Sequence, residues 1–375
     1  MTQDTNHEPA KVYFADLRAR TPNRNRTAKL KKLFEAAGFG DVVKKGDLTG
    51  VKVHFGERGC DTHISPTYVR AMVERIKACG GRAFVTDTNT LYSGSRHNAV
   101  DHMVTAVEHG FDYAVLGAPV IIADGLDSTN VLEVPVAGKH FQSVKIAGDI
   151  VRADSLLVLS HFKGHELAGF GGAVKNLAMG CAPRAGKQEQ HCVRFVVDAK
   201  KCIGCQECVK VCPVGAATMD GKKAVIDKAT CIGCGECLTV CRKKAMSINW
   251  HTEIVPFMER LVEYALGAVT GKKGRVGYVN FLVNVTPDCD CVPWSDAPIV
   301  PDIGFLASTD PVALDKACLD LVNAQAACPE CKLEHGLGTG EDKFAALWQW
   351  TRGDVTFVHG AAVGLGRPEY ELVRI

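Results

Sequence analysis

The order of apolar and polar positions predicts alternating strands and helices over the first half of the chain. Residues 155–162, SLLVLSHF, are apolar throughout their first half, which is typical of a strand covered on both faces. Residues 66–81 carry apolar side chains at helical spacing and end in two glycines, which predicts a helix. Residues 51–56 and 82–87 are predicted strands, and 97–111 is a second predicted helix. Strand–helix–strand units of this length predict an α/β domain with a parallel or mixed sheet.

This pattern breaks near Phe195 and resumes after Trp250. Between these points the chain is rich in cysteine and contains an internal repeat. The stretch CIGCQECVKVCPVGAATM at 202–219 is echoed by CIGCGECLTVCRKKAMSI at 231–248. We therefore expect a small domain that is inserted into a larger, discontinuous one.

The α/β pattern after the insertion consists of two helices and a strand. Residues 257–269 predict a helix, 275–285 a strand, and 310–325 a helix that opens at an aspartate N-cap followed by proline. Residues 131–148 are typical instead of a β-hairpin at the edge of the fold. The predicted domains are 1–195 and 250–375 for the two parts of the α/β domain, and 196–249 for the insertion.

Composition and charge indicate which classes of binding partner this chain is not suited to. It has 375 residues, of which 46% are hydrophobic and 23% charged, as is ordinary for a globular protein. The net charge of +2 gives no general attraction to nucleic acid or to an acidic membrane surface. No apolar run reaches the about 18 residues of a spanning helix, and the N-terminus lacks a basic start followed by an apolar stretch. We therefore expect a cytoplasmic protein that binds neither nucleic acid nor membrane.

The 17 cysteines are the unusual feature of the composition, and eight of them fall in the repeat. Residues 202–213 have the pattern C-x2-C-x2-C-x3-C-P, and 231–241 repeat it without the proline. This is the bacterial two-cluster ferredoxin run, in which the fourth cysteine of each half ligates the other cluster. Two zinc sites are the alternative, because zinc also uses C-x2-C pairs, but the third cysteine and the proline favour clusters. One [4Fe–4S] cluster is expected on Cys202, Cys205, Cys208 and Cys241, and the second on Cys231, Cys234, Cys237 and Cys212.

The insertion is also basic, with nine Lys and Arg against five Asp and Glu in residues 196–249. A basic surface can offset the negative charge of thiolate-bound clusters, or it can dock an acidic electron carrier. We expect single-electron transfer through the insertion and a redox partner such as a ferredoxin or a reductase. A simple solvated surface is the plainer interpretation of the same charges.

Residues 161–176, HFKGHELAGFGGAVKN, combine flexible backbone positions with many titratable groups. They follow the predicted buried strand, and open α/β sheets bind ligands at the carboxyl ends of their strands. Gly169, Gly171 and Gly172 let the backbone approach a ligand closely and expose N–H groups at a helix start. We expect these glycines to contribute to a cofactor or anion site.

The side chains of this stretch supply the candidate chemistry. Lys163 and Lys175 can hold a carboxylate or phosphate, and Lys175 can act as an amine nucleophile if it is desolvated. His161 is a candidate binding residue and His165 a candidate general acid or base. The alternative is a glycine-rich structural turn with exposed polar side chains. An additional metal or an organic cofactor near Lys175 is a further expectation.

Two other loops also follow predicted strands and are expected on the same rim. Residues 54–63, HFGERGCDTH, contain Arg58, and residues 87–98, DTNTLYSGSRHN, contain His97. Three loops rich in His, Arg and acidic residues at one rim favour a common site, although each alone can be an ordinary surface loop. We predict supporting catalytic roles for Arg58 and His97.

A second set of cysteines lies outside the repeat. Cys289 and Cys291, in DCDC, are candidates with Cys328 and Cys331 for a zinc or iron site, and the alternative is free thiols in a reducing cell. Residues 184–191, RAGKQEQH, are expected to be a polar linker that can close over a ligand.

The whole chain resembles the family called domain of unknown function 362, whose members are described as iron–sulfur centre proteins. The resemblance covers nearly the full length and includes the cysteine repeat. It is carried by the stretches KVHFGERGCDTHISP (52–66), HFKGHELAGFGGAVKNLAMG (161–180), NFLVNVTPDCDC (280–291) and VPDIGFLASTDPVALD (300–315).

A shorter stretch, GHELAGFGGAVK at 164–175, is similar to the active-site segment of the lactate racemase family. In that family a histidine precedes a glycine-flanked lysine by ten positions, and His165 and Lys175 match this spacing. The resemblance implies a histidine that handles a substrate proton and a lysine that tethers a nickel-pincer nucleotide. It also offers His97 and Arg58 as counterparts of other active-site groups. The racemases lack a ferredoxin insertion, which favours different chemistry at a shared site.

These observations predict an iron–sulfur oxidoreductase. Electrons would enter through the insertion and reach a small anionic substrate or a second cofactor at the loop rim of the α/β domain. One alternative is a racemase or epimerase that uses His165 and Lys175 and has structural clusters. Another is a non-enzymatic electron carrier or maturation partner.

Overall fold

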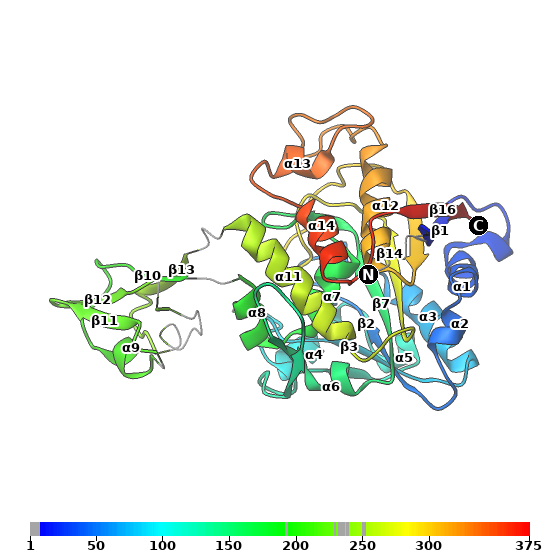
Figure 1. Ribbon diagram of the computed structural model, residues 1–375. Coiled ribbons are helices and arrows are strands. Elements are labelled where there is room, and N and C mark those ends of the chain that lie inside the picture. The colour runs from blue at the N-terminus through cyan, green and yellow to red at the C-terminus, as the bar shows by residue number, and fades with distance from the viewer. Residues whose placement is uncertain are drawn as a thin grey trace, which may run out of the picture.

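A mixed eight-stranded sheet forms the centre of the molecule (Figure 1). The computed structural model describes residues 8–375 except for 93, 192–193, 213, 229, 232–236, 238–239 and 250–252. The strand order is β16-β1-β15-β14-β7-β2-β3-β4, in which β15 runs antiparallel to both of its neighbours and the other pairs are parallel. In that order the strands span Tyr370–Arg374, Ala10–Asp16, Gly304–Ser308, Val276–Leu282, Ser155–His161, Leu48–Lys52, Arg82–Asp87 and Val120–Ile122. The predicted α/β fold is confirmed, and of the two expected sheets it is the mixed one.

Helices cover both faces of this sheet. Along β7, Leu156 and Val158 belong to one hydrophobic core, while Leu157 and Leu159 belong to the other, because successive strand residues point to opposite faces. All seven residues of β7 are therefore buried, as its apolar pattern predicted. The first core contains residues of α7 (Ala173–Cys181), α11 (Ile254–Val269), α12 (Pro311–Asn323) and α14 (Val355–Ala362). The second contains residues of α1 (Arg26–Ala36), α2 (Phe39–Val42), α3 (Pro66–Ala78), α4 (Ala99–Glu108) and α5 (Tyr113–Leu116).

Most predicted elements of the α/β domain are confirmed. The strand at 82–87 is β3 residue for residue, and the helix predicted at 310–325 is α12. Asp310 caps α12, because its carboxylate accepts hydrogen bonds from Val312 N and Ala313 N. The hairpin predicted at 131–148 is formed by β5 (Val131–Pro135) and β6 (Ser143–Ala147), which make a separate two-stranded sheet.

Two local predictions are wrong. The strand expected at 51–56 is β2, which begins at Leu48 and ends at Lys52. The apolar run continued past the strand because Val53 and Phe55 are buried in the core beyond its end, where Val53 N still donates to Thr86 O of β3 at 3.1 Å. The expected linker at 184–191 is the helix α8 (Arg184–His191), whose buried side chains are polar, so that the usual apolar signal is missing.

The cysteine-rich segment forms a small unit of its own. Strand β10 (Arg194–Val197) pairs antiparallel with β13 (Met246–Asn249), and β11 (Ala217–Asp220) pairs with β12 (Lys223–Ile226). Helix α9 (Glu207–Lys210) packs on β11. Figure 1 shows this unit at one end of the molecule, beyond α8 and α11. Among the described elements, those of the unit pack chiefly on one another and contact the α/β elements only sparsely.

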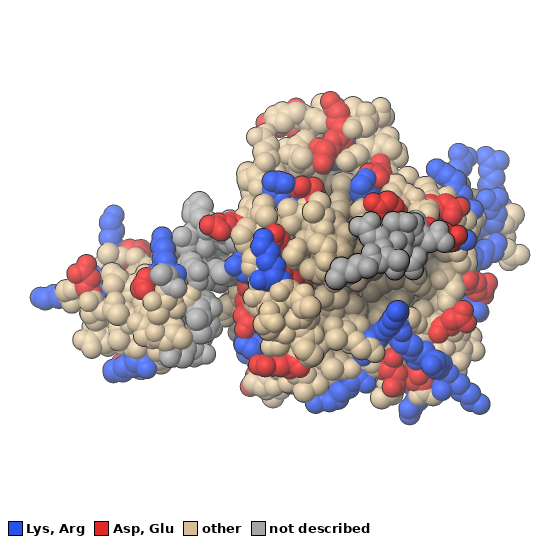
Figure 2. All heavy atoms as spheres, viewed as in Figure 1, with Lys and Arg blue, Asp and Glu red and all other residues tan. Residues whose placement is uncertain are grey.

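The remaining elements are short. They are the 3-10 turn η1 (Pro22–Arg24), α6 (Gly148–Arg152), α13 (Lys343–Leu347) and the hairpin strands β8 (Lys163–His165) and β9 (Gly169–Gly171). None of the helices in the described part of the chain has the length and apolar character needed to cross a bilayer. Figure 2 shows acidic and basic side chains interspersed over most of the visible face, in keeping with the small net charge.

Candidate functional site

The loops at the carboxyl ends of four adjacent parallel strands enclose a cavity of about 360 Å³. Strands β14, β7, β2 and β3 lie side by side, so the loops that follow them open at one edge of the sheet. Helices α7 and α8 complete the wall. The polar and cysteine residues that line the cavity are His54, Asp87, Thr88, Thr90, Tyr92, Arg96, His165, Glu166, Lys175, Lys187, His191, Cys289 and Cys291.

A tight hairpin brings His165 into this cavity. Strands β8 and β9 pair so that Lys163 faces Gly171 and His165 faces Gly169, where the backbone turns with φ +80°. Gly164 N donates to Thr286 O at 2.8 Å, and a Cβ at Gly164 would overlap the Pro287 carbonyl. Only glycine permits this close approach, because any side chain would overlap the Pro287 carbonyl. The hairpin therefore packs directly against the loop that carries Cys289.

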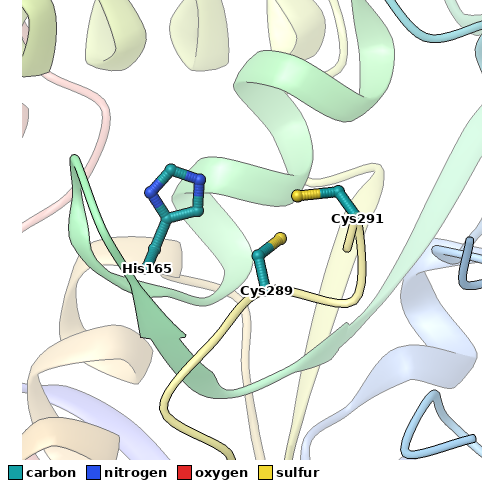
Figure 3. Close-up of side chains that lie close together, drawn as sticks. All are labelled: His165, Cys289 and Cys291. Carbon is teal, nitrogen blue, oxygen red and sulfur yellow. The ribbon is translucent and has the colours of Figure 1, made fainter. Parts of the chain in front are cut away.

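His165, Cys289 and Cys291 meet at the inner end of the cavity (Figure 3). One ligand atom from each lies within 4.8 Å of the others. Among the described residues, this is the group of histidine, cysteine and acidic side chains whose atoms lie close enough to hold one metal ion. Two thiolates and an imidazole are ligands that zinc and other thiophilic metals accept, so a possible metal site is present.

The charges around the cysteine pair favour a thiolate at Cys289. Lys175 Nζ lies 3.5 Å from Cys289 Sγ. A hydrogen bond from the Cys291 thiol, together with the positive charges of Lys175 and Lys163, holds the pKa of Cys289 well below its usual range. The same hydrogen bond and burial raise the pKa of Cys291, which therefore keeps its proton.

His165 is held as a neutral ring with a defined orientation. Its Nδ1 accepts hydrogen bonds from Leu167 N and Ala168 N, both at 3.1 Å. Burial, and the nearby charge of Lys175, lower the pKa of His165 well below its usual value. The proton of the neutral ring is therefore on Nε2, and Figure 3 shows the ring turned toward the two cysteines.

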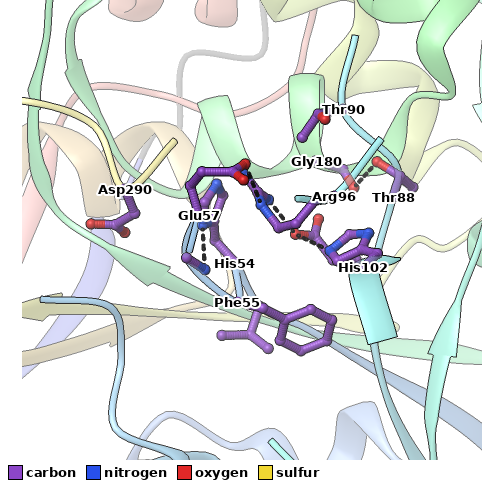
Figure 4. A network of polar contacts seen from close by, with 12 residues as sticks. His54, Phe55, Glu57, Thr88, Thr90, Arg96, His102, Gly180 and Asp290 are labelled. Atoms are coloured by element: carbon purple, nitrogen blue, oxygen red, sulfur yellow. Dashed lines mark hydrogen bonds and ion pairs between the residues drawn. The ribbon is translucent and has the colours of Figure 1, made fainter. Parts of the chain in front are cut away.

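A buried network of charges forms the floor on the β2 and β3 side (Figure 4). Asp87 pairs with Lys52 at 2.9 Å and with Arg96 at 3.4 Å, and Arg96 Nε reaches Glu57 at 3.3 Å. All four side chains are almost fully buried. Burial alone would raise the pKa of Asp87. Its interactions with Lys52, His54, His102 and Arg96 outweigh burial, so the pKa of Asp87 lies below its ordinary value. His54, whose pKa is lowered by burial, lies beside this network.

Lys163 and His161 both contact the buried carboxylate of Asp290. His161 Nδ1 lies 2.9 Å from Asp290 Oδ1, and Lys163 Nζ lies 3.5 Å from Asp290 Oδ2. Both side chains line a small adjoining cavity of about 40 Å³ that also touches Gly171, Gly172, Lys175 and Cys289. These two residues therefore hold the loop between the two cysteines in place.

The structure does not bring every predicted residue to the cavity. Arg58 has a half-exposed side chain that pairs with Glu108 at 2.7 Å, outside the lining. His97 also lies outside the lining, where Nδ1 donates to Tyr92 O at 3.2 Å and Nε2 accepts from Arg184 Nη1 at 2.7 Å. Their predicted catalytic roles stay predictions without geometric support. Gly169 belongs to the hairpin turn but to neither cavity lining.

Helix α8 and the cysteine pair also contribute to the site. Lys187 and His191 line the cavity from α8, which we expected to be a linker. Lys187 donates to Thr88 Oγ1 and Ala182 O, both at 2.6 Å, and burial lowers its pKa to about 8. Cys289 and Cys291 meet His165, whereas Cys328 and Cys331, their expected partners, are not part of this group. Lys52 of the charge network was not selected, although a lysine within an apolar strand is a signal of a buried, paired charge.

The cysteine-rich unit has a cavity of its own, of about 220 Å³. Cys202, Cys205 and Cys208 from the first half of the repeat line it together with Cys241 from the second. This is the set of four that the crossed-over arrangement predicts. Cys212, Cys231 and Cys237 belong to the same small core, and Cys234 lies outside the described residues.

Backbone amides point at several of these sulfurs. Ala224 N donates to Cys202 Sγ at 3.4 Å, Ala245 N to Cys241 Sγ at 3.2 Å and Ala217 N to Cys212 Sγ at 3.4 Å. Amide donors of this kind stabilise thiolate charge, and hydrogen bonds to sulfur tune metal centres. The unit therefore offers hydrogen-bond donors to thiolate ligands, while burial raises the pKa of the Cys208 thiol.

Comparison with known proteins places these features in a family. The model described as Domain of unknown function (DUF362) matches residues 49–320. The chain belongs to this family. The DUF362 match runs from β2 into α12, so it contains both the α/β cavity and the cysteine-rich unit.

Two solved structures match this DUF362 chain at low similarity. One is the lactate racemase apoprotein from Thermoanaerobacterium thermosaccharolyticum, with 12% identity, a TM-score of 0.37, and coverage of 73% of this chain and 51% of that one. Another is a structural genomics target from Thermotoga maritima, with 11% identity, a TM-score of 0.34, and coverage of 70% and 50%. The chain thus spans about half the length of each of these proteins. No curated protein matches it.

Proposed function

We propose that this protein is an iron–sulfur oxidoreductase. The cysteine-rich unit would hold two [4Fe–4S] clusters, and the α/β cavity would receive a small anionic substrate. The observation that carries the proposal is the convergence of Cys202, Cys205, Cys208 and Cys241 on one cavity from both halves of the repeat. When bound, clusters of this type supply single-electron transfer.

The residues of the unit fit this assignment. The four sulfurs come from segments 33 or more residues apart in the chain (208 to 241), which a local zinc knuckle would not require. Amide donors lie beside Cys202, Cys212 and Cys241, as described above. We infer the second ligand set to be Cys231, Cys234, Cys237 and Cys212.

The charge of the α/β cavity supports an anionic substrate. Arg96, Lys175 and Lys187 line it, and of these Arg96 is paired with the buried carboxylates of its floor. Neither Lys175 nor Lys187 has a carboxylate within ion-pair distance among the described residues. Lys175 Nζ lies 3.5 Å from Cys289 Sγ, and Lys187 Nζ donates to Thr88 Oγ1 and Ala182 O. A small carboxylate or another compact anion complements this pair.

Anaerobic reconstitution with iron and sulfide tests the cluster assignment. We expect about eight iron and about eight sulfide per chain, since each cluster holds four of each. Cys205→Ser should lower both counts by about half, whereas Cys79→Ser, a thiol at the end of α3 in the α/β domain, should change neither. Zinc in place of iron in protein purified without oxygen would contradict the proposal.

The redox role is tested by mixing the protein, with its clusters reduced, with candidate substrates and measuring the rate of cluster reoxidation. We expect at least one small carboxylate in a screen to reoxidise the reduced clusters more rapidly than buffer does. A basic surface on the unit favours a further partner protein, an acidic ferredoxin or a reductase, as the source of electrons. Identical reoxidation rates with every compound of a broad screen would count against an oxidoreductase and favour a simple electron carrier. The sparse contact between the unit and the α/β elements also favours an electron carrier.

A second candidate function is an isomerase of the racemase or epimerase type. It is favoured by one observation, that His165 and Lys175 both line the α/β cavity. Such an enzyme would exchange a substrate C–H hydrogen with solvent deuterium in the absence of any reductant. Exchange that persists when the clusters have been removed would favour this candidate over the oxidoreductase.

A further inference from the structure

Cys289 and Cys291 lie on a tight turn whose geometry suits an internal disulfide. Val292 N donates to Cys289 O at 3.1 Å, which closes a four-residue turn and shortens the distance between the two cysteine Cα atoms. The two sulfurs lie within 4.8 Å of each other, so rotation of the side chains can bring them to bonding distance. Asp290 between them is held from behind by the buried side chains of His161 and Lys163, so the turn is fixed while the thiols remain at the cavity.

The groups beside the sulfurs are hydrogen-bond donors. Lys175 Nζ lies 3.5 Å from Cys289 Sγ. His165 Nδ1 is occupied by two backbone amides, which leaves the Nε2 proton on the side of the sulfurs. A histidine that ligates a metal nearly always donates its second ring N–H to a carboxylate or a carbonyl, and here that nitrogen is an acceptor. The arrangement therefore fits a thiolate with proton donors around it better than it fits a metal ion.

We propose that Cys289 and Cys291 are a redox-active dithiol that reduces a small disulfide carrying carboxylates. The Cys289 thiolate attacks one sulfur of the substrate, which forms a mixed disulfide and releases the first thiolate. That thiolate takes the proton of Cys291, and Cys291 then attacks Cys289 Sγ and releases the second thiolate, which is protonated by solvent. The net result is one protein disulfide and two substrate thiols, so two sulfurs are oxidised and two are reduced.

The surroundings define the substrate class. The cavity of about 360 Å³ has room for a small molecule, and Lys175 and Lys187 at its wall complement carboxylates. Return of the protein disulfide to the Cys289 thiolate and the Cys291 thiol takes two electrons and one proton. This last step rests on the proposed function, because the single-electron donor it requires is the cysteine-rich unit with its clusters.

A single-turnover experiment tests the dithiol on the full-length protein. The reduced protein is exposed without oxygen to dithiodiglycolate, a dicarboxylate disulfide, or to the neutral 2-hydroxyethyl disulfide, and free thiols are then alkylated. We expect mass spectrometry to find an internal Cys289–Cys291 disulfide, formed at least tenfold faster with the dicarboxylate. Cys291→Ser should instead accumulate a mixed disulfide on Cys289. The matched control, Cys79→Ser, should behave as the wild type.

Two results would overturn the inference. One is that both thiols remain open to alkylation after long exposure to either disulfide. The other is that the purified protein holds one zinc or iron ion that is lost in Cys289→Ser, which would assign the group to a metal. A protein with two full clusters and inert thiols would leave the proposed function standing. A protein without clusters whose dithiol still oxidises would remove the proposed function and keep the dithiol.

Discussion

At the scale of single residues, the cavity depends on charges that are buried as a set. Lys52, Asp87, Arg96 and Glu57 lie under it with almost no exposed surface, and each has an opposite charge within 3.4 Å. Taking such groups out of water is costly, and only their mutual attraction offsets the cost. The network is therefore intolerant of the loss of one member, and it sets the electrostatic field in which a ligand binds.

We expect Asp87→Asn to lower the free energy of unfolding by about 3–5 kcal/mol, because it leaves Lys52 and Arg96 buried without their shared counterion. Denaturant unfolding measures the loss. Asp101→Asn, an exposed residue in the first turn of α4, is the matched control and should change stability by less than about 0.5 kcal/mol. A loss at Asp87 no greater than that of the control would show that the network is not stabilising.

The same carboxylate predicts a dependence on pH. The pKa of Asp87 is lower in the folded protein than in the unfolded chain, so its contribution is complete above about pH 4 and is lost as the pH falls further. We expect the slope of unfolding free energy against pH in this acid range to be smaller in Asp87→Asn than in the wild type. Equal slopes in the two proteins would contradict the assignment.

Lys187 predicts a pH effect on ligand binding. Burial lowers its pKa to about 8, so its positive charge is lost as the pH rises through that value, well before that of an ordinary lysine. We expect the affinity for a small dicarboxylate such as malonate, measured by calorimetry, to fall between pH 7 and pH 9. In Lys187→Met the affinity should be low at pH 7 and nearly flat over this range, whereas Lys11→Met, on the exposed side of β1, should retain the wild-type profile.

At the scale of elements, the site is made by a hairpin and a helix that are fixed from distant segments. Asp315 on α12 accepts hydrogen bonds from Ala173 N at 2.7 Å and Val174 N at 3.0 Å, at the start of the helix that carries Lys175. The hairpin of β8 and β9 is fixed by Gly164 against the loop that follows β14. Each catalytic candidate is thus positioned by packing at another point of the chain.

Gly164→Ala tests this positioning. The added methyl group meets the Pro287 carbonyl, so we expect a loss of about 1–3 kcal/mol in stability and slower, incomplete formation of the Cys289–Cys291 disulfide. Gly40→Ala, where a Cβ meets no atom within 4 Å, is the control and should lower neither the stability nor the rate of disulfide formation. Wild-type disulfide formation in Gly164→Ala would mean that the hairpin does not set the geometry of the cysteine turn.

At the scale of the whole molecule, the cysteine-rich unit is attached through two strands and packs mainly on itself. Val197 on β10 lies opposite Met246 on β13, so the chain leaves and returns at one place. With this attachment, the cysteine-rich unit can be inserted into the chain without changing the eight-stranded sheet. The attachment also implies that the stability of the unit depends on its own small core and, under the proposed function, on its clusters.

We expect the α/β domain to tolerate removal of the unit. Replacing residues 198–245 by Asn-Gly closes β10 and β13 as a two-residue hairpin. The thermal midpoint of the α/β domain should stay within about 2 °C of the wild type, since a ΔΔG below about 0.5 kcal/mol is expected where few contacts are lost. Bound iron should disappear, and single-turnover oxidation of Cys289 and Cys291 should persist. Aggregation or a large fall in the midpoint would show that the unit supports the sheet.

The sequence by itself determined the features that local patterns encode. The continuous apolar run of β7, the helical spacing of α3 and the capping aspartate of α12 each report the burial or termination of one segment. The cysteine spacing also predicted a ligand set, and four of its members line one cavity in the structure. These signals are local because the periodicity of apolar residues and the reach of short ligand motifs are properties of a few neighbouring residues.

Tertiary structure alone decided which groups meet. His165 and Cys289 are brought together because β7 and β14 are neighbours in the sheet, and no local pattern encodes strand order. The same packing placed Lys187 in the cavity through a polar helix and left Arg58 outside it, paired with Glu108. Residue type told us what chemistry each side chain can perform, and the order of the strands decided which of them share one site.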